Sequence, residues 1–405
     1  MMPKTAIRAA LFAILTTASF AGGDWQSGLD ATLEASVGIE GGAQSGQALH
    51  GLALAHAIWQ QGETGQGAPT FSAYFSALGL AGKGPSERFI GDFLAASNIE
   101  GYPSVRVYSW WVQAVGHDWS LRAGALLADE EFAGTTAGGN FFNSSFGWPA
   151  FISANTINTG PAFFVAAPGL RLEFKGNESI ACRVGIYDGD TFDSPSGDPA
   201  VNQFGLHYRL GGNQGWFAIA EVSVAQPNAA TRFKIGAWLH TAAFSDLHDD
   251  ASGNPFVVTG NQPREYGSNH GGYFAVEHTL AGTTGSAGNI EFFFRVGMAP
   301  SDRNAIDWAI DSGLAMTGPL PGRPADVVSI GVAQAQFSSG FRAQAQLTDP
   351  FNATPDYERV IEINYKYRLS DRFSLQPDLQ YIWHPGGSHG QPDALAFFLR
   401  FNASY

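Results

Sequence analysis

Residues 357–383 have the sequence YERVIEINYKYRLSDRFSLQPDLQYIW, and their pattern recurs along the chain. From Ile361 to Leu369 every second residue is Ile, Tyr or Leu, and the residues between them are Glu, Asn, Lys and Arg. Successive side chains of a strand point to opposite faces, so this segment predicts a strand with one apolar and one polar face. Ser370 and Asp371 join it almost directly to a second candidate strand, Phe373–Trp383. The stretch therefore predicts an antiparallel hairpin.

The same alternation returns in segments of roughly ten residues that are separated by Gly, Asn, Asp and Pro. Ala68–Leu80 and Gly288–Met298 are two long examples, and Phe204–Leu210 is a short one. Counting all such segments gives about sixteen or seventeen strands, which suits one barrel of porin size. Lipid offers no partner for unpaired backbone groups, so a membrane-spanning sheet must close on itself. We therefore expect an all-β fold, a transmembrane antiparallel β-barrel of about 16 strands.

The composition agrees with half-buried strands. There are 50 Gly, 31 Phe, 12 Tyr and 10 Trp beside only 22 Lys plus Arg and 36 Asp plus Glu. Many aromatic and few charged residues disfavour disorder and favour extended structure. The net charge of −14 argues against nucleic acid as a partner and favours neutral or cationic solutes over strongly anionic ones.

The first residues predict export. Lys4 and Arg8 precede an apolar run that ends in Ser-Phe-Ala at 19–21, the pattern of a secretory signal peptide with its cleavage site. The run is too short to span a membrane as a helix. We expect a signal peptide at 1–21 and one outer-membrane β-barrel at 22–405.

The connections between the predicted strands differ in length, as they do in bacterial outer-membrane barrels with short periplasmic turns and longer outer loops. The predicted tight turns are Ser370–Asp371, Gly211–Gly215 and Gly116–Asp118, and the predicted outer loops are Asp188–Ala200, Ser245–Gly272 and Gln336–Asp356.

The last predicted strand, Ala394–Tyr405, ends the chain on an aromatic residue. Such an end looks like the signal that the outer-membrane assembly machinery recognises. We therefore expect the protein in the outer membrane of a Gram-negative bacterium. Its expected partners there are membrane lipid and lipopolysaccharide, and the assembly machinery through the strand that ends in Tyr405.

Several short motifs between Ser97 and Gly189 occur in a fixed order. They include SNIEG at 97–101, RVY at 106–108, FNSSFGWP at 142–149 and YDGD at 187–190. Together they resemble the carbohydrate-selective porin family of the Pseudomonas glucose porin type, often called OprB. The resemblance implies a sixteen-stranded monomeric channel for passive diffusion of glucose and related sugars, narrowed by loops that fold inward, so carbohydrate solutes are its further expected partners.

A sugar has polar edges and weakly apolar C–H faces, so a selective passage needs aromatic side chains beside hydrogen-bonding groups. Arg106 looks like the family's lumen arginine. Strict alternation places Arg106, Tyr108 and Trp110 together on the lumen face and Trp111 toward lipid. The alternatives are that Arg106 forms a structural ion pair and that the aromatic residues belong to the interfacial girdles.

The Gly-, Asn- and Phe-rich stretch Asp129–Pro161 is predicted to fold inward as a constriction loop. Phe142, Asn143 and Phe146 would then form part of an eyelet that is both apolar and hydrogen-bonding. The alternative is an ordinary outer loop packed against the barrel wall.

The sequence predicts neither a cofactor nor a metal site nor an enzyme. Cys182 is the only cysteine, and the histidines lack the spacing of a zinc pair. Acidic residues between Asp188 and Asp198 leave calcium binding as an open alternative. The predicted function is passive, weakly selective diffusion of glucose-like mono- or oligosaccharides through a single lumen. The alternatives are a general non-selective porin, a secreted or outer-membrane β-rich adhesin, an outer-membrane hydrolase, and an energy-coupled transporter.

Overall fold

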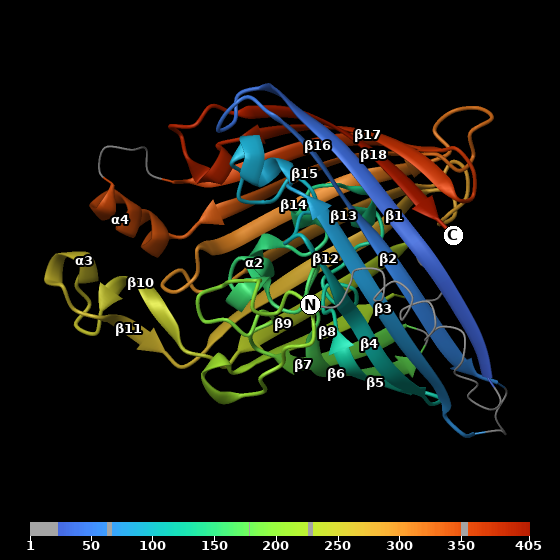
Figure 1. Ribbon diagram of the computed structural model, residues 1–405, viewed down its shortest axis with the longest axis horizontal. Helices are drawn as coiled ribbons and strands as arrows, with labels where there is room; N and C mark the ends of the chain where they lie inside the picture. The colour runs from blue at the N-terminus through green and yellow to red at the C-terminus, as the bar shows by residue number, and fades with distance from the viewer. Residues whose placement is uncertain (1–22, 63–66, 178, 226–229, 350–354) are drawn as a thin grey trace, which may run out of the picture.

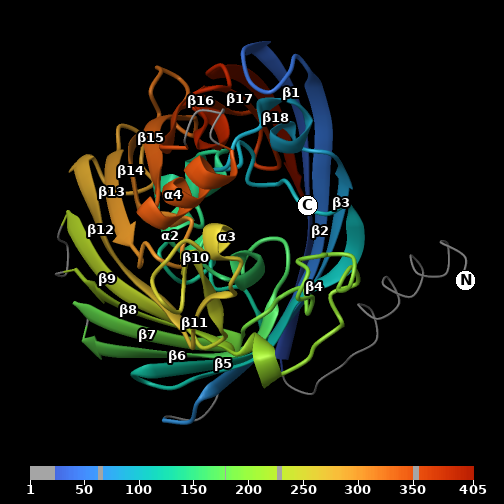
Figure 2. The ribbon, with the colours of Figure 1, turned by 90° about the vertical axis from the view of Figure 1, so that its left-hand side faces the viewer.

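Sixteen antiparallel strands close into one barrel in the computed structural model, which describes residues 23–62, 67–177, 179–225, 230–349 and 355–405 (Figures 1 and 2). Strands that follow one another in sequence pair around the wall, and β1 pairs with β18 to close it. The predicted barrel is confirmed. The predicted signal peptide lies outside the described residues.

The barrel strands are β1 Gly23–Glu40, β2 Gln47–Gln61, β3 Thr70–Gly82, β4 Ser104–Val115, β5 Trp119–Leu126, β6 Ala167–Asn177, β7 Ile180–Asp188, β8 Trp216–Val224, β9 Thr231–His240, β12 Asn269–Ala281, β13 Ile290–Met298, β14 Ile306–Thr317, β15 Val327–Phe337, β16 Tyr357–Arg368, β17 Phe373–Trp383 and β18 Ala394–Ser404. Outside the barrel, β10 Phe244–Asp250 pairs with β11 Pro263–Tyr266. The helical segments are η1 Ser86–Ile90, η2 Gly138–Asn140, η3 Ser144–Phe146, α2 Ala150–Ser153, η4 Ile157–Thr159, η5 Gly212–Gln214, α3 Phe256–Thr259, α4 Ser339–Thr348 and η6 Pro385–Gly387. No helix of the described residues is long and apolar enough to cross a membrane.

The two faces of the wall differ as the alternation predicts. On β18, Phe397, Leu399 and Phe401 are exposed on the outside, whereas Phe398 and Arg400 are buried on the inside. The apolar outer surface suits lipid, and the polar inner positions are available to bind loops or to line a passage.

The long connections all lie at one end of the barrel, opposite the C-terminus (Figure 1). We call four of them L2 (83–103), L3 (127–166), L4 (189–215) and L5 (241–268). Since the longer loops of such barrels face outward from the cell, this end is the outer mouth. L5 contains the β10–β11 hairpin, whose strands the sequence did not predict.

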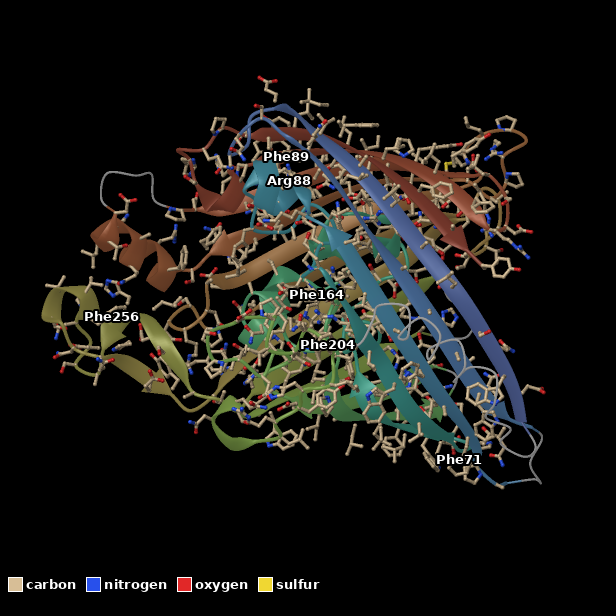
Figure 3. The ribbon with its side chains drawn as sticks, in the orientation of Figure 1. Phe71, Arg88, Phe89, Phe164, Phe204 and Phe256 are labelled. Atoms are coloured by element: carbon tan, nitrogen blue, oxygen red, sulfur yellow. The ribbon has the colours of Figure 1, made fainter. Side chains whose placement is uncertain are left out.

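Two predictions about L4 are wrong. Phe204–Leu210 is not a strand, and Gly211–Gly215 is therefore not a tight turn between two wall strands but part of the same outer loop. The short β5 pairs with β4 only from Trp110 onward, which leaves the earlier part of that edge of β4 without a strand partner. Val107 N donates to Phe204 O at 3.0 Å, so L4 covers this edge (Figure 3). The alternating apolar residues Phe204, Leu206 and Leu210 of L4 are exposed on the outside of the barrel. No strand of the described residues pairs with this segment on the side away from β4.

Candidate functional site

L3 lies inside the barrel, as predicted, and fills much of the lumen (Figure 2). Its aromatic residues Phe141, Phe142, Phe146 and Phe151 are all buried. Phe141 and Phe146 stack at 4.3 Å between ring centroids, and both lie against Phe293 of β13. L3 therefore has an apolar core of its own that packs on the inner wall.

Arg295 of β13 binds the backbone of L3. Its Nη1 donates to Ala133 O at 2.5 Å and to Gly147 O at 3.1 Å, and its Nη2 donates to the carbonyl oxygens of Ser145 and Phe146 at 2.8 and 3.0 Å. Its Nε forms a 3.0 Å ion pair with Asp311 of β14. Arg295 is 0% exposed, so one buried cation donates to four carbonyls of the loop.

Glu362 of β16 is the acidic counterpart. Its carboxylate accepts from Phe142 N at 2.6 Å and from Asn143 N at 2.9 Å. The neighbouring inner-wall residue Gln376 donates to Asn140 O at 2.9 Å. The inner wall thus supplies acceptors for loop amides and donors for loop carbonyls at separate points.

L2 is held in the same way and joins L3. Glu358 accepts from Phe93 N and Leu94 N, each at 2.7 Å. Asn98 N donates to Phe142 O at 2.6 Å, and Ser144 N donates to Ala95 O at 2.9 Å. We call this contact, Ala95–Asn98 against Phe141–Ser144, the L2–L3 junction.

Three cavities follow one another through the lumen. The outer cavity, about 570 Å³, lies between L2 and L3. It shares Asp129 and Gly147 with a central cavity of about 360 Å³, and the central cavity shares Thr136 with an inner cavity of about 150 Å³. The inner cavity reaches Ala225 and Thr279, near the short turns. These shared residues place the three cavities next to one another between the outer mouth and the periplasmic end.

Residues of both charge signs line the central cavity. Asp129, Glu130 and Glu131 of L3 line it together with Arg183 of β7 and Lys234 of β9. Arg183 Nη1 donates to Glu131 O at 3.1 Å, and Lys234 Nζ donates to Gly134 O at 2.6 Å, so both basic side chains also hold L3. A solute in this cavity therefore meets side chains of both charge signs.

The outer cavity contains carboxyl groups and aromatic side chains. Burial raises the pKa of Glu100 to about 8 and that of Asp129 to about 6. Trp148, Phe163 and Phe164 also line this cavity, and Trp148 Nε1 donates to Thr159 O at 2.8 Å. Aromatic faces thus lie beside groups that can donate or accept hydrogen bonds.

Arg106 points inward and is 2% exposed. Its Nε and Nη2 donate to Ser104 Oγ at 3.0 and 2.7 Å, and its Cζ lies 5.0 Å from the Phe164 ring centroid. Among the described residues its Nη1 has no hydrogen-bond partner. Arg106 therefore lies directly behind one aromatic wall of the outer cavity rather than on its surface.

The prediction that Trp110 shares the lumen face with Arg106 is wrong. A bulge places Ser76 of β3 opposite both Tyr108 and Ser109, and Ser76 Oγ accepts from Ser109 N at 3.1 Å while donating to Ser109 O at 3.0 Å. The extra residue reverses the alternation beyond it. Trp110 is consequently 39% exposed on the outside.

Trp111 takes the inward position instead and is 9% exposed. It stacks on Tyr74 at 5.3 Å between ring centroids, and the Arg122 Cζ lies 4.1 Å from its ring centroid. Tyr108, at the bulge, packs against the small cluster of Ala125, Leu127 and Ala166 and against Phe163.

Phe142 and Asn143 lie at the L2–L3 junction and are 0% and 1% exposed. They anchor L3 and do not line any of the three cavities, which corrects their predicted place in an eyelet. Phe146 does line the central cavity. The difference arises because Glu362 binds the 142–143 backbone and draws it to the wall.

Sequence reasoning missed the residues that hold L3. Glu362 and Arg295 both occupy the polar side of strands that were predicted correctly, so their inward direction was readable. The loop residues that they bind could not be read from the sequence, because these partners lie some 150 to 220 residues away.

The acidic stretch after β7 closes a turn. Asp190 Oδ1 accepts from Phe192 N and Asp193 N, and Oδ2 accepts from Ser194 N. In the described part of the chain no group of three or more His, Cys, Asp or Glu side chains is arranged to hold a metal ion.

Comparison with known proteins agrees with this geometry. Residues 63–405 match the family described as carbohydrate-selective porin, OprB family. Porin B of Pseudomonas aeruginosa is 24% identical over 185 residues, which is 43% of this chain but only 41% of that relative. The chain therefore matches less than half of that curated relative's length.

Solved structures share the fold. The high-pH structure of Pseudomonas putida OprB superimposes with a TM-score of 0.80 at 18% identity and covers 99% of this chain and 97% of its own. The outer-membrane channel DcaP of Acinetobacter baumannii gives a TM-score of 0.57 at 12% identity over 96% and 99% of the two chains. Family and fold are those of a channel rather than an enzyme. The chain belongs to the carbohydrate-selective porin family, OprB, and is an outer-membrane porin of a Gram-negative bacterium.

Proposed function

We propose that this porin allows passive, weakly selective diffusion of glucose-like mono- and oligosaccharides through its single lumen. The observation that carries the proposal is the series of three cavities, which passes from an aromatic outer cavity to a charged central one. No cofactor or energy input enters the proposal.

The outer cavity suits the chemistry of a sugar. Trp148 and Phe163 offer faces for C–H groups, and Asn98, Ser144 and Ser153 offer hydrogen bonds for hydroxyls. Binding of this kind is weak enough to permit release, which a channel requires. Arg106 would act by supporting Phe164, and Phe146 by narrowing the central cavity.

The charges of the passage favour neutral solutes over acidic ones. Asp129 and, at higher pH, Glu100 are the acidic residues that line the outer cavity, and the central cavity is lined by Glu130 and Glu131 together with Arg183 and Lys234. A sugar acid would meet carboxylates before it reached a basic side chain.

The remaining partners are part of the same proposal. The exposed apolar outer surface would contact lipid and lipopolysaccharide. The assembly machinery would recognise the last strand, whose Tyr405 is exposed and exchanges backbone hydrogen bonds of 2.9 Å with Leu29 of β1. Residues 1–21 would direct export and be removed.

Swelling of proteoliposomes in isosmotic solutions of glucose, maltose, raffinose and gluconate tests this function. We expect rates that fall with sugar size and a lower rate for gluconate than for glucose. Trp148→Leu should reduce the difference among neutral sugars, whereas the matched change Trp110→Leu on the outer face should not. Equal swelling in all solutes would indicate the general porin, and no swelling from folded protein would refute a sugar channel.

A further inference from the structure

We infer that Arg400 of β18 is the positioning residue that holds L2 and L3 together and so sets the aperture of the passage. The inference rests on the proposed function in one respect only, that solutes pass beside these loops. Arg400 lines none of the three cavities, so its effect would be exerted through the loops.

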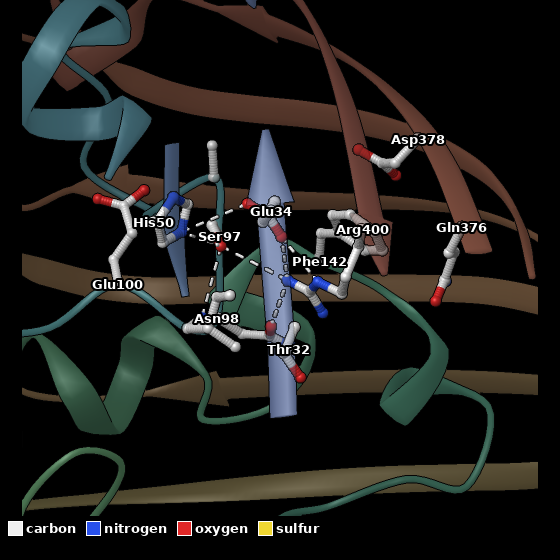
Figure 4. Close-up of polar contacts among 12 residues, drawn as sticks. Thr32, Glu34, His50, Ser97, Asn98, Glu100, Phe142, Gln376, Asp378 and Arg400 are labelled. Carbon is white, nitrogen blue, oxygen red and sulfur yellow. Dashed lines mark hydrogen bonds and ion pairs between the residues drawn. The ribbon is translucent and has the colours of Figure 1, made fainter. Parts of the chain in front are cut away.

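The guanidinium of Arg400 touches three elements at once (Figure 4). Its Nε and Nη2 lie 2.7 and 2.6 Å from Glu34 Oε2 of β1, and its Nη2 donates to Asn98 Oδ1 of L2 at 2.9 Å. Its Cζ lies 3.7 Å from the centroid of the Phe142 ring of L3. One planar side chain therefore binds the wall, hydrogen-bonds one loop and stacks on the other.

Asn98 and Phe142 are also the residues through which the two loops meet. Asn98 N donates to Phe142 O at 2.6 Å, and Asn98 Nδ2 donates to Phe141 O at 3.0 Å. Asn98 in addition lines the outer cavity. Arg400 thus holds the L2–L3 junction on the side that faces the barrel wall. The other side of the junction borders the outer cavity.

The groups around Arg400 are structural. Glu34 Oε1 lies 3.4 Å from His50 Nε2, and that same nitrogen lies 3.2 Å from Ser97 Oγ. A serine hydrolase needs the acid and the serine on opposite ring nitrogens. Here His50 Nδ1 has no hydrogen-bond partner among the described residues, and Ser97 is buried. These three residues therefore fix L2 to β1 and β2 and are not arranged as the catalytic triad of a serine hydrolase.

Glu362 holds the same turn of L3 by binding the backbone of the turn. It accepts from Phe142 N and Asn143 N, while Arg400 and Phe398 contact the Phe142 ring. Loss of Arg400 would leave L3 attached through Glu362 and Arg295 and L2 attached through Glu358, but it would remove the side chain that joins the two loops to the wall and so loosen the L2–L3 junction. A wider, less discriminating passage is expected rather than an unfolded barrel.

The test compares Arg400→Met, Arg400→Lys and the double variant Glu34→Gln/Arg400→Met with the wild type in planar bilayers. The double variant removes both buried charges, so it avoids leaving Glu34 unpaired. Arg368→Met is the matched control, because its side chain is half exposed beside a periplasmic turn. Single-channel conductance in KCl and the largest oligosaccharide that enters proteoliposomes are measured, with folding checked by heat-modified gel migration.

We expect about a twofold rise in conductance and entry of a larger oligosaccharide for Arg400→Met and for the double variant, since the constriction limits ion flow. Arg400→Lys should lie between them and the wild type, because an ammonium keeps the ion pair but not the stacking. Arg368→Met should match the wild type. Unchanged conductance and size limit in a folded Arg400 variant would overturn the inference.

If the Arg400 variants fail to fold, Asn98→Ala decides the question, because it removes the side-chain contacts of Asn98 with Arg400 and with Phe141 O and leaves the Glu34–Arg400 pair in place. A conductance equal to that of the wild type would then overturn the inference. Failure of the proposed function would give a different result. The wild-type channel would then not discriminate among sugars, and this outcome does not depend on whether the Arg400 variants change the conductance.

Discussion

L3 and L5 start from similar positions and take opposite directions. Both leave a wall strand at the outer mouth, and both contain Gly, Asn and Asp, yet L3 fills the lumen whereas the L5 hairpin projects away from the barrel (Figure 1). The polar groups of L3 are satisfied by wall residues such as Arg295 and Glu362. Those of L5 are satisfied within L5 and by the neighbouring outer loop, where Leu247 N donates to Asp302 O at 2.7 Å and Arg303 Nη1 donates to Ser268 O at 3.0 Å.

Asp250 shows how L5 closes on itself. Its Oδ1 accepts from Ser252 N and Asn254 N, and its Oδ2 accepts from Thr259 Oγ1 and Asn261 Nδ2. Asp246 similarly accepts from two amides of its own loop and from Tyr266. The comparison teaches that the inward polar residues of the wall strands, rather than loop composition, decide which loop narrows the pore.

The largest expected effect comes from Arg295→Met. This change removes the donors for four L3 carbonyls and leaves Asp311 without its cation. Breaking a buried pair in this way should lower the free energy of unfolding by about 3 to 5 kcal/mol. Urea unfolding measures the loss, and single-channel conductance should rise in protein that still folds. A stable variant with wild-type conductance would show that L3 does not depend on the wall.

Glu362→Gln should have a smaller effect of the same kind. A glutamine side chain has one acceptor oxygen, so one of the amides of Phe142 and Asn143 loses its partner, at a cost of about 1 to 3 kcal/mol. The L3 turn would then detach reversibly from the wall, so we expect larger fluctuations of the single-channel current. Quiet channels with unchanged urea midpoints would contradict this assignment.

The ion preference of the passage should depend on pH. The pKa of Asp129 is raised to about 6 and that of Glu100 to about 8, so both carboxyls are neutral in acid and ionise as the pH rises. Preference for K⁺ over Cl⁻ should therefore increase from about pH 5 to about pH 9. Zero-current potentials in a KCl gradient measure it, and Asp129→Asn should remove the lower step. A preference that falls with pH would exclude these groups as the source.

Asp250→Asn should leave the channel unchanged. The carboxylate accepts hydrogen bonds only inside L5, and its pKa is lowered to about 2, chiefly by the hydrogen bond from Asn261. We expect wild-type conductance and sugar dependence, with faster proteolysis of L5 as the sole change. Altered conductance would mean that L5 also touches the passage.

The strands were predictable because alternation between lipid and lumen is local. It located every barrel strand, and it failed at Phe204–Leu210, where exposed apolar residues alternate without a partner strand. It also failed at Trp110, because the bulge at Ser76 depends on pairing between two strands. The inward fold of L3 was anticipated, but the burial of Phe142 and Asn143 follows from Glu362, more than 200 residues away in sequence. Such contacts leave no local signal.

The most direct test of the account is the single-channel current of the wild-type protein during titration with glucose. If sugars bind in the loop-lined cavities and pass through them, the current should fall saturably as glucose fills the passage. A current that declines only in proportion to solution viscosity, without saturation, would contradict the sugar-binding passage and leave a general pore.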